Sequence, residues 1–302
     1  MSCSGLVPTG GKFQIPRTDA CDMKWGVVVH GGAGSPRNLS GGPASAATAA
    51  MNILRSGGRA VDASAEATKV MEDDDRFNAG TGSVLRFDGN AYMDAAVMDS
   101  EENCGVVAYL TRTKNPVLVA RKVMESPHVF LAADGAVDFA RKNGFNDYDS
   151  RTPRTINRLE KGMDDFRKGI RPEWPRNWKN YKVDTVGAVA MDGMGRFAAA
   201  GSTGGTFPAL KGRVGDIAMI GCGIFAGPEG AVAATGIGEE IIRKVLSKTV
   251  YDYMCNGLSA QEAVDKGVSL YDRSVSIGII SINSEGFGIA STTDMASHHL
   301  TE

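Results

Sequence analysis

Apolar runs separated by turn residues divide the first half of the chain into strands and helices. The run from Trp25 to His30 predicts a buried strand that stops at a glycine-rich turn. Residues 43–71 are rich in alanine and predict helix, interrupted at Gly57-Gly58. The other elements expected before residue 150 are strands at 83–99 and 104–111, and two helices within 116–144 that are divided at Ser126-Pro127.

The pattern changes between residues 150 and 184, where charged residues replace the apolar periodicity. The first part of this segment predicts a helix, and its end predicts an exposed linker. Strand signals return on either side of the turn Asp192-Gly193, which predicts a hairpin. Short turns between strands favour antiparallel sheets, so we expect an α+β fold. The elements expected after 184 are strands at 185–191, 196–200, 217–226, 230–235, 275–283 and 287–292, and helices at about 238–255 and 259–271.

Composition and charge narrow the functional class. The 33 Lys and Arg against 35 Asp and Glu give a net charge of −2, which argues against a nucleic-acid binder that works by neutralising phosphates. No run approaches the ~18 apolar residues of a membrane span. The five cysteines, at 3, 21, 104, 222 and 255, have no zinc spacing and predict a reducing compartment, the cytoplasm. Residues 1–24 are polar, show no secretory signal and predict a flexible extension.

Thr185 is a candidate nucleophile because of where it stands. A charged segment ends at Asp184, and Thr185 opens an apolar strand. Cleavage between the two residues would give Thr185 a hydroxyl and a free α-amine, whose pKa of about 7.7–8.0 suits a general base near neutral pH. On this segment alone, an ordinary strand threonine is the simpler interpretation.

Three downstream segments also carry chemistry. Ser202-Thr-Gly-Gly205 places hydroxyls beside permissive backbone. Arg213 and Asp216 suit the carboxylate and ammonium of a zwitterion, although their spacing alone is equally typical of a surface salt bridge. Thr235-Gly236 follows a strand and precedes a helix, so it fits both a helix N-cap and an oxyanion site.

Metal and phosphate sites have weaker support. The acidic run Glu72–Asp75 lacks the alternating oxygen ligands of a hard-cation loop, and no glycine-rich segment matches a nucleotide-binding motif. His30 is expected to be a hydrogen-bonded core histidine, and His298 and His299 are expected in solvent.

Seven segments taken together are far more specific than any one of them. They are VVHGGAG at 28–34, FNAGTGSVL at 77–85, MDAAVMD at 93–99, DTVGAVAMD at 184–192, STGG at 202–205, GRVGD at 212–216 and ATGIGE at 234–239. In this order they resemble the plant-type L-asparaginase and isoaspartyl peptidase family of N-terminal-nucleophile hydrolases. The resemblance runs from about residue 25 to the C-terminus and implies one domain over 25–302, built as a four-layer αββα sandwich of two mainly antiparallel sheets between helical layers.

The resemblance also implies processing and site roles. Self-cleavage between Asp184 and Thr185 would give an α chain (1–184) and a β chain (185–302), with 150–184 as the linker that ends at the cleavage site, and two such αβ units would form a homodimer. The implied roles are Thr185 as nucleophile, Thr203 as its hydrogen-bond partner, Asn78 as an ordering residue, Arg213 and Asp216 as ligands of the substrate α-carboxylate and α-ammonium, and Thr235 and Gly236 as the oxyanion hole.

The family's alkali-metal loop would fall at Met71 to Thr81. The backbone carbonyls implied as Na⁺ ligands are those of Met71, Glu72, Asp74, Phe77, Ala79 and Thr81. No organic cofactor, nucleic acid or membrane is implied; the implied partners are small-molecule substrates. The chain departs from the family where Asp184 replaces the more usual glycine before the nucleophile, where Ile217-Ala218 replaces Ser-Pro, and in segment 206–211.

The function that the resemblance implies is hydrolysis of β-aspartyl dipeptides and deamination of L-asparagine to L-aspartate and ammonia. A glycoasparaginase acting on N-acetylglucosaminyl-asparagine is one alternative, favoured by Asp-Thr at the cut. A precursor that stays uncut and only binds an aspartyl ligand is another, suggested by Ile217 and the altered segment 206–211. A metal-dependent or nucleotide-binding α/β enzyme is a more remote alternative.

Overall fold

The computed structural model describes residues 24–169 and 184–302. Residues 1–23 of the predicted extension and 170–183 of the predicted linker lie outside the described part. The strands are β1 (Gly26–Ala33), β2 (Met93–Asp99), β3 (Cys104–Leu110), β4 (Phe130–Ala132), β5 (Val186–Met191), β6 (Phe197–Thr203), β7 (Ile224–Gly227), β8 (Gly230–Gly236), β9 (Ile277–Asn283), β10 (Gly286–Ser291) and β11 (Met295–Thr301). The helices are α1 (Gly41–Arg55), α2 (Ala60–Asp73), α3 (Pro116–Val123), α4 (Ala133–Lys142), α5 (Pro153–Arg167), α6 (Gly238–Lys244), α7 (Leu246–Cys255) and α8 (Ala260–Val268).

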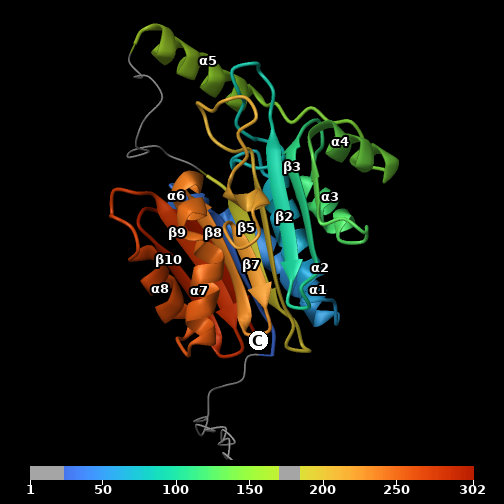
Figure 1. Ribbon diagram of the computed structural model, residues 1–302, viewed down its shortest axis with the longest axis vertical. Coiled ribbons are helices and arrows are strands. Elements are labelled where there is room, and N and C mark those ends of the chain that lie inside the picture. Colours follow the sequence, from blue (N-terminus) through green and yellow to red (C-terminus); the bar gives the residue numbers. More distant parts are fainter. Residues whose placement is uncertain (1–23, 170–183) are drawn as a thin grey trace, which may run out of the picture.

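Two sheets lie at the centre of this arrangement (Figure 1). A seven-stranded sheet has the order β11-β1-β5-β6-β2-β3-β4, and a four-stranded sheet has the order β10-β9-β8-β7. Neighbouring strands are antiparallel except β3 and β4, which are parallel. Helices α1, α2 and α3 pack against the larger sheet, and α7 and α8 pack against the smaller one. The expected α+β class is confirmed.

The central strands β5 and β6 are buried along their whole length, which explains their composition. Ala198 and Ala200 of β6 face the helices, and Ala199 faces the second sheet. A strand that is covered on both faces has a continuous apolar sequence without alternating polar residues. Its small side chains let the covering layers approach closely. The ends of β5 and β6 are therefore held by packing on both sides, which gives a rigid base to the residues that follow or precede them.

Several elements differ from the sequence-based expectations. The strand expected at 83–99 begins only at Met93, because 83–92 form a loop closed by one bridge between Leu85 and Ala91. The helix expected at 238–255 is divided at Val245, whose φ of 46° breaks the helical path. A 3₁₀ turn at 216–218 precedes β7 where a continuous strand was expected.

Two strands were missed altogether, β4 and β11. Strand β11 pairs with β1 and carries His298 and His299. His298 is half-buried, so its expected place in solvent was wrong, whereas His299 is exposed and stacks on Phe287. The two adjacent histidines interrupt the apolar pattern of this segment, so the pattern did not indicate a strand there. No helix in residues 24–169 or 184–302 is long and apolar enough to cross a bilayer.

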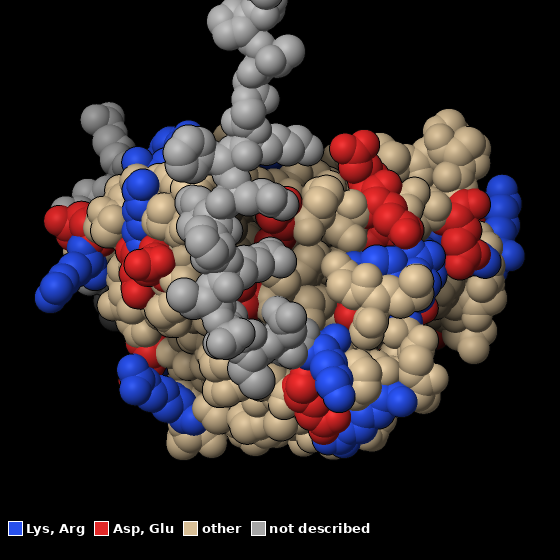
Figure 2. Space-filling view, turned by 90° about the horizontal axis from the view of Figure 1, so that it is seen from below, with Lys and Arg blue, Asp and Glu red and all other residues tan. Residues whose placement is uncertain are grey.

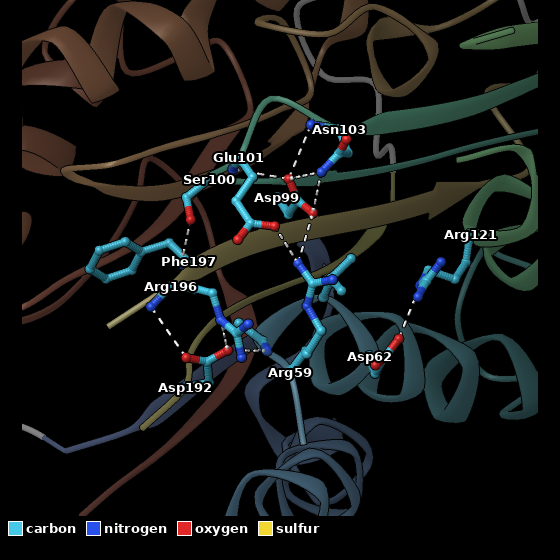
Figure 3. A network of polar contacts seen from close by, with 12 residues as sticks. Arg59, Asp62, Asp99, Ser100, Glu101, Asn103, Arg121, Asp192, Arg196 and Phe197 are labelled. Atoms are coloured by element: carbon cyan, nitrogen blue, oxygen red, sulfur yellow. Dashed lines mark hydrogen bonds and ion pairs between the residues drawn. The ribbon is translucent and has the colours of Figure 1, made fainter. Parts of the chain in front are cut away.

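A polar network ties the strand turns to the start of α2 (Figure 3). Asp192, in the turn between β5 and β6, is buried; its Oδ2 accepts the Ala60 N–H at 3.0 Å and the Arg196 Nε–H at 2.9 Å. Arg59, just before α2, pairs with Asp99 at 3.4 Å and with Glu101 at 2.6 Å. The Asp192 carboxylate thus satisfies one of the unpaired N–H groups with which α2 begins.

We expect Asp192→Ala to lower the free energy of unfolding by about 1–3 kcal/mol, because it leaves buried donors without an acceptor. Glu101→Ala, which removes an exposed ion pair from the same network, is the matched control and should cost at most about 1 kcal/mol. Thermal unfolding followed by circular dichroism measures both. Equal shifts of the two midpoints would contradict the importance of the buried carboxylate.

Candidate active site

Thr185 and Thr203 lie side by side at the same end of β5 and β6. Val186 pairs with Ser202 in the antiparallel register, which places the next residues outward, Thr185 and Thr203, opposite one another. The Thr185 Oγ1 donates a hydrogen bond to the Thr203 Oγ1 at 3.1 Å, and both side chains are buried. The Thr203 Oγ1 also accepts the Gly205 N–H at 3.0 Å, so its position is fixed from the following turn.

The carbonyl of Asp184, which belongs to the bond before Thr185, is fixed by Asn78. The Asn78 Nδ2 donates to this carbonyl oxygen at 2.8 Å and to the Gly205 carbonyl at 2.8 Å. Its Oδ1 accepts the Val84 N–H at 2.8 Å, which settles the orientation of the amide. Thr203 lies 3.5 Å from the same Asp184 oxygen. The Thr203 hydroxyl therefore lies beside the Asp184 carbonyl, which the Asn78 amide polarises.

The backbone of residues 184 and 185 passes so close to Gly32 that no side chain fits at this position. At Gly32 a Cβ would lie 2.7 Å from the Thr185 nitrogen and 2.8 Å from the Asp184 Cα, and the φ of +106° is itself unfavourable for other residues. The preceding His30 is fully buried against Gly187. It lies in the core as expected, where its polar interaction is with the backbone of Thr185. Burial lowers the pKa of His30 to about 3, opposed by the Thr185 backbone, and the ring is neutral.

Thr235 and Gly236 are linked to the Thr185–Thr203 pair by a hydrogen bond to the end of β1. The Thr235 Oγ1 accepts the Ala33 N–H at 3.2 Å, next to the glycine that contacts Thr185. At Gly236, with φ +134°, a Cβ would lie 2.1 Å from the Ser276 oxygen, so only glycine fits. The helix that follows, α6, begins two residues later at Gly238, so the unpaired N–H groups of its first turn come directly after Gly236 in the chain.

Arg213 and Asp216 both lie against Gly238. A Cβ at Gly238 would lie 2.7 Å from the Asp216 Oδ1 and 2.8 Å from the Arg213 Nη2. The two residues form no ion pair with each other, so the surface salt bridge that their spacing suggested is absent. Arg213 instead donates to Glu239 through Nε at 3.1 Å and Nη2 at 3.2 Å. The Asp216 Oδ2 is buried without a hydrogen-bond partner among the described residues, and burial raises the pKa of Asp216 to about 7.

Residues that the sequence analysis did not single out hold the Arg213 loop. The buried Asp94 accepts the Gly215 N–H at 2.8 Å through Oδ2 and the Tyr109 N–H at 2.9 Å through Oδ1. The Tyr109 Oη in turn accepts the Gly212 N–H at 2.8 Å. Tyr109 has a φ of 55°, which is rare for a residue with a side chain. Asp94 stands in the segment MDAAVMD that carried the family resemblance, and this was the only signal for its role in the sequence.

The loop expected to bind an alkali ion carries carbonyl oxygens that already accept hydrogen bonds. The Glu72 oxygen accepts the Thr81 N–H at 2.9 Å, the Asp74 oxygen accepts the Phe77 N–H at 3.1 Å, and the Phe77 oxygen lies 3.5 Å from the Arg154 Nη2. The described residues hold no cluster of three acidic, histidine or cysteine side chains suited to a metal. Each carbonyl oxygen keeps a second lone pair that these hydrogen bonds do not use.

Within the described residues, the structure thus brings together a threonine hydroxyl, a fixed carbonyl, the Arg213 guanidinium and the Asp216 carboxyl group. These are the elements of a hydrolase that uses a threonine nucleophile on a zwitterionic amide. The comparisons with known proteins agree. A family model described as "Asparaginase" matches residues 23–300. The chain belongs to this asparaginase family.

Named relatives share most of the chain. The plant-type L-asparaginase of Pyrococcus abyssi is 40% identical over 290 residues, which cover 90% of this chain and 94% of that protein. The isoaspartyl peptidase/L-asparaginase of Danio rerio is 42% identical over 248 residues, covering 79% of each chain. The protein of the same name from Rattus norvegicus is 38% identical over 300 residues, covering 94% of this chain and 88% of that protein.

Proposed function

We propose that this chain is a threonine hydrolase that cuts itself between Asp184 and Thr185 and then hydrolyses L-asparagine and β-aspartyl dipeptides. The observation that carries the proposal is the Asp184 carbonyl held by Asn78 beside the Thr185–Thr203 hydroxyl pair. The names of the plant-type L-asparaginase and isoaspartyl peptidase relatives support the substrate class.

Self-cleavage follows from these contacts. The Thr185 hydroxyl attacks the Asp184 carbonyl carbon, and the Asn78 Nδ2 stabilises the negative charge that develops on its oxygen. The C–N bond between residues 184 and 185 breaks, the hydroxyl proton passes to the Thr185 nitrogen, and an ester joins Asp184 to the Thr185 oxygen. Water then hydrolyses the ester and leaves Thr185 with a free α-amine.

The same hydroxyl then serves the substrate. The α-amine of Thr185 takes the hydroxyl proton as the oxygen attacks the side-chain carbonyl of the aspartyl unit. Arg213 binds the α-carboxylate, Asp216 binds the α-ammonium, and Thr235 and Gly236 stabilise the oxyanion. The proton goes to the leaving nitrogen, so ammonia or an amino acid departs, and water hydrolyses the aspartyl ester. An ammonium near the Asp216 carboxylate would favour its ionised form and offset the cost of its burial.

Further proposals concern the whole molecule. The packing of helices on the outer faces of two facing sheets supports the four-layer αββα sandwich. A single domain over 25–302 and a homodimer of αβ units remain proposals, the latter testable by light scattering. The cytoplasm remains the expected compartment on the cysteine pattern, and Cys104, Cys222 and Cys255 are unpaired.

We expect purified wild-type protein to release ammonia from L-asparagine and free amino acid from a β-aspartyl dipeptide. Thr185→Ala removes the nucleophile and should abolish both activities, whereas Thr185→Ser keeps a hydroxyl and should retain part of them. Coupled assays of ammonia and aspartate measure the result. Turnover of N-acetylglucosaminyl-asparagine alone would favour the glycoasparaginase alternative, and a folded protein without turnover of any of the three would favour the uncut binding protein.

We also propose Na⁺ in the loop from Met71 to Thr81, where it would stabilise the fold without entering the reaction. We expect NaCl to raise the thermal unfolding midpoint more than choline chloride at the same ionic strength, because only the alkali ion fits a carbonyl cage. Equal midpoints in the two salts would contradict a sodium site.

A further inference from the structure

Arg86 is a buried cation that the proposed mechanism does not use. It lies in the loop between α2 and β2 and is 5% exposed. Its Nη1 donates to the Thr206 carbonyl at 3.1 Å, and its Nε has no hydrogen-bond partner. No carboxylate among the described residues forms an ion pair with it, although Asp94 is a more distant favourable charge. A buried guanidinium without an anion is costly, so its presence requires a reason.

The free end of Arg86 faces Arg213 across Gly205. A Cβ at Gly205 would lie 2.5 Å from the Arg86 Nη2 and 3.3 Å from the Arg213 Nη1. The two nitrogens therefore lie close together against Gly205, where a side chain would collide with them. Burial and the charge of Arg213 both lower the pKa of Arg86, as expected for two cations that meet without an anion between them.

Gly205 belongs to the candidate active site. Gly205 donates its N–H to Thr203, the partner of Thr185, and its carbonyl accepts from Asn78. A pocket of about 440 Å³ opens beside it and is lined in part by Thr206, whose carbonyl binds Arg86, and by Arg213. Arg213 thus borders this pocket, and the Thr206 carbonyl links the pocket wall to Arg86.

Glu239 engages two of the five N–H donors of Arg213, and the whole Nη1 group stays available to a ligand here. Glu239 accepts from Nε and Nη2, whereas Nη1 has no hydrogen bond to a described residue. A carboxylate bound by Arg213 alone would share the guanidinium with Glu239 and would leave Arg86 without an anion. A carboxylate between the Arg213 Nη1 and the Arg86 Nη2 would meet two free donors and supply the missing negative charge.

We propose that Arg86 is a substrate-binding residue, which with Arg213 holds the α-carboxylate of the aspartyl unit over Gly205. This inference rests on the proposed function and deepens it. Under this assignment, Arg86 and Arg213 together select substrates with a free α-carboxylate over substrates in which this group is an amide or an ester. The bound α-carboxylate also supplies the buried guanidinium of Arg86 with an anion.

Variants at residue 86 test the charge directly. Arg86→Met removes the charge and keeps the length, Arg86→Lys keeps the charge, and Arg55→Met, an exposed arginine paired with Glu302, is the control. The substrates are L-asparagine and its α-amide, in which a neutral group replaces the carboxylate. We expect Arg86→Met to lower kcat/KM for L-asparagine by about tenfold to hundredfold, mostly through KM, and to change the α-amide little. Lysine should restore part of the loss.

A purely structural role for Arg86, through Thr206, predicts the same loss on both substrates, and that result would overturn the assignment. Calorimetric binding of the product L-aspartate gives a readout without turnover. We expect at least tenfold weaker binding to Arg86→Met, together with a ligand-free thermal midpoint no lower than that of wild type, because a buried charge is removed. Unchanged affinity, or no aspartate binding by wild type, would overturn the assignment. A third outcome is a protein that binds aspartate through Arg86 but hydrolyses no substrate. That result would contradict the proposed function and leave the assignment of Arg86 intact.

Discussion

The side-chain amide of Asn78 is the interaction on which the arrangement of the site depends. It joins the Asp184 carbonyl, the Gly205 carbonyl and the Val84 N–H, which come from three separate segments. Each of these contacts fixes a different part of the proposed chemistry: the bond to be cut, the turn after Thr203, and the loop that carries Arg86. These contacts need one side chain that carries N–H donors and an oxygen acceptor. Aspartate has no donor, and leucine has neither a donor nor an acceptor.

Close backbone approach is the second constraint. Gly32 touches the 184–185 backbone, Gly205 separates two guanidinium groups, and Gly238 lies against both Arg213 and Asp216. At each position a side chain would collide with the backbone of the proposed nucleophile or with a side chain that is proposed to bind the substrate. The frequent glycines of the chain, 38 of 302, are thus partly explained by the site that they surround.

The sequence predicted the fold class, the central hairpin and the candidate nucleophile, because these depend on local apolar runs and on ordered motifs. It did not predict the partners of Arg213. The spacing to Asp216 suggested a salt bridge, whereas the fold pairs Arg213 with Glu239 and anchors its loop on Asp94, which is 121 residues away. Arg86 reaches Thr206 across 120 residues, and no local pattern encodes such a contact. Strand β11 was missed because its histidines interrupt the apolar signal.

The central claim is that the contacts of Thr185 and Asn78 serve to break the bond between residues 184 and 185. The intact mass of the purified wild-type chain, followed during incubation at neutral pH, tests it most directly. The account predicts two masses that correspond to residues 1–184 and 185–302, with asparaginase activity that rises as the cut proceeds. An uncut chain that hydrolyses L-asparagine at full rate would contradict it.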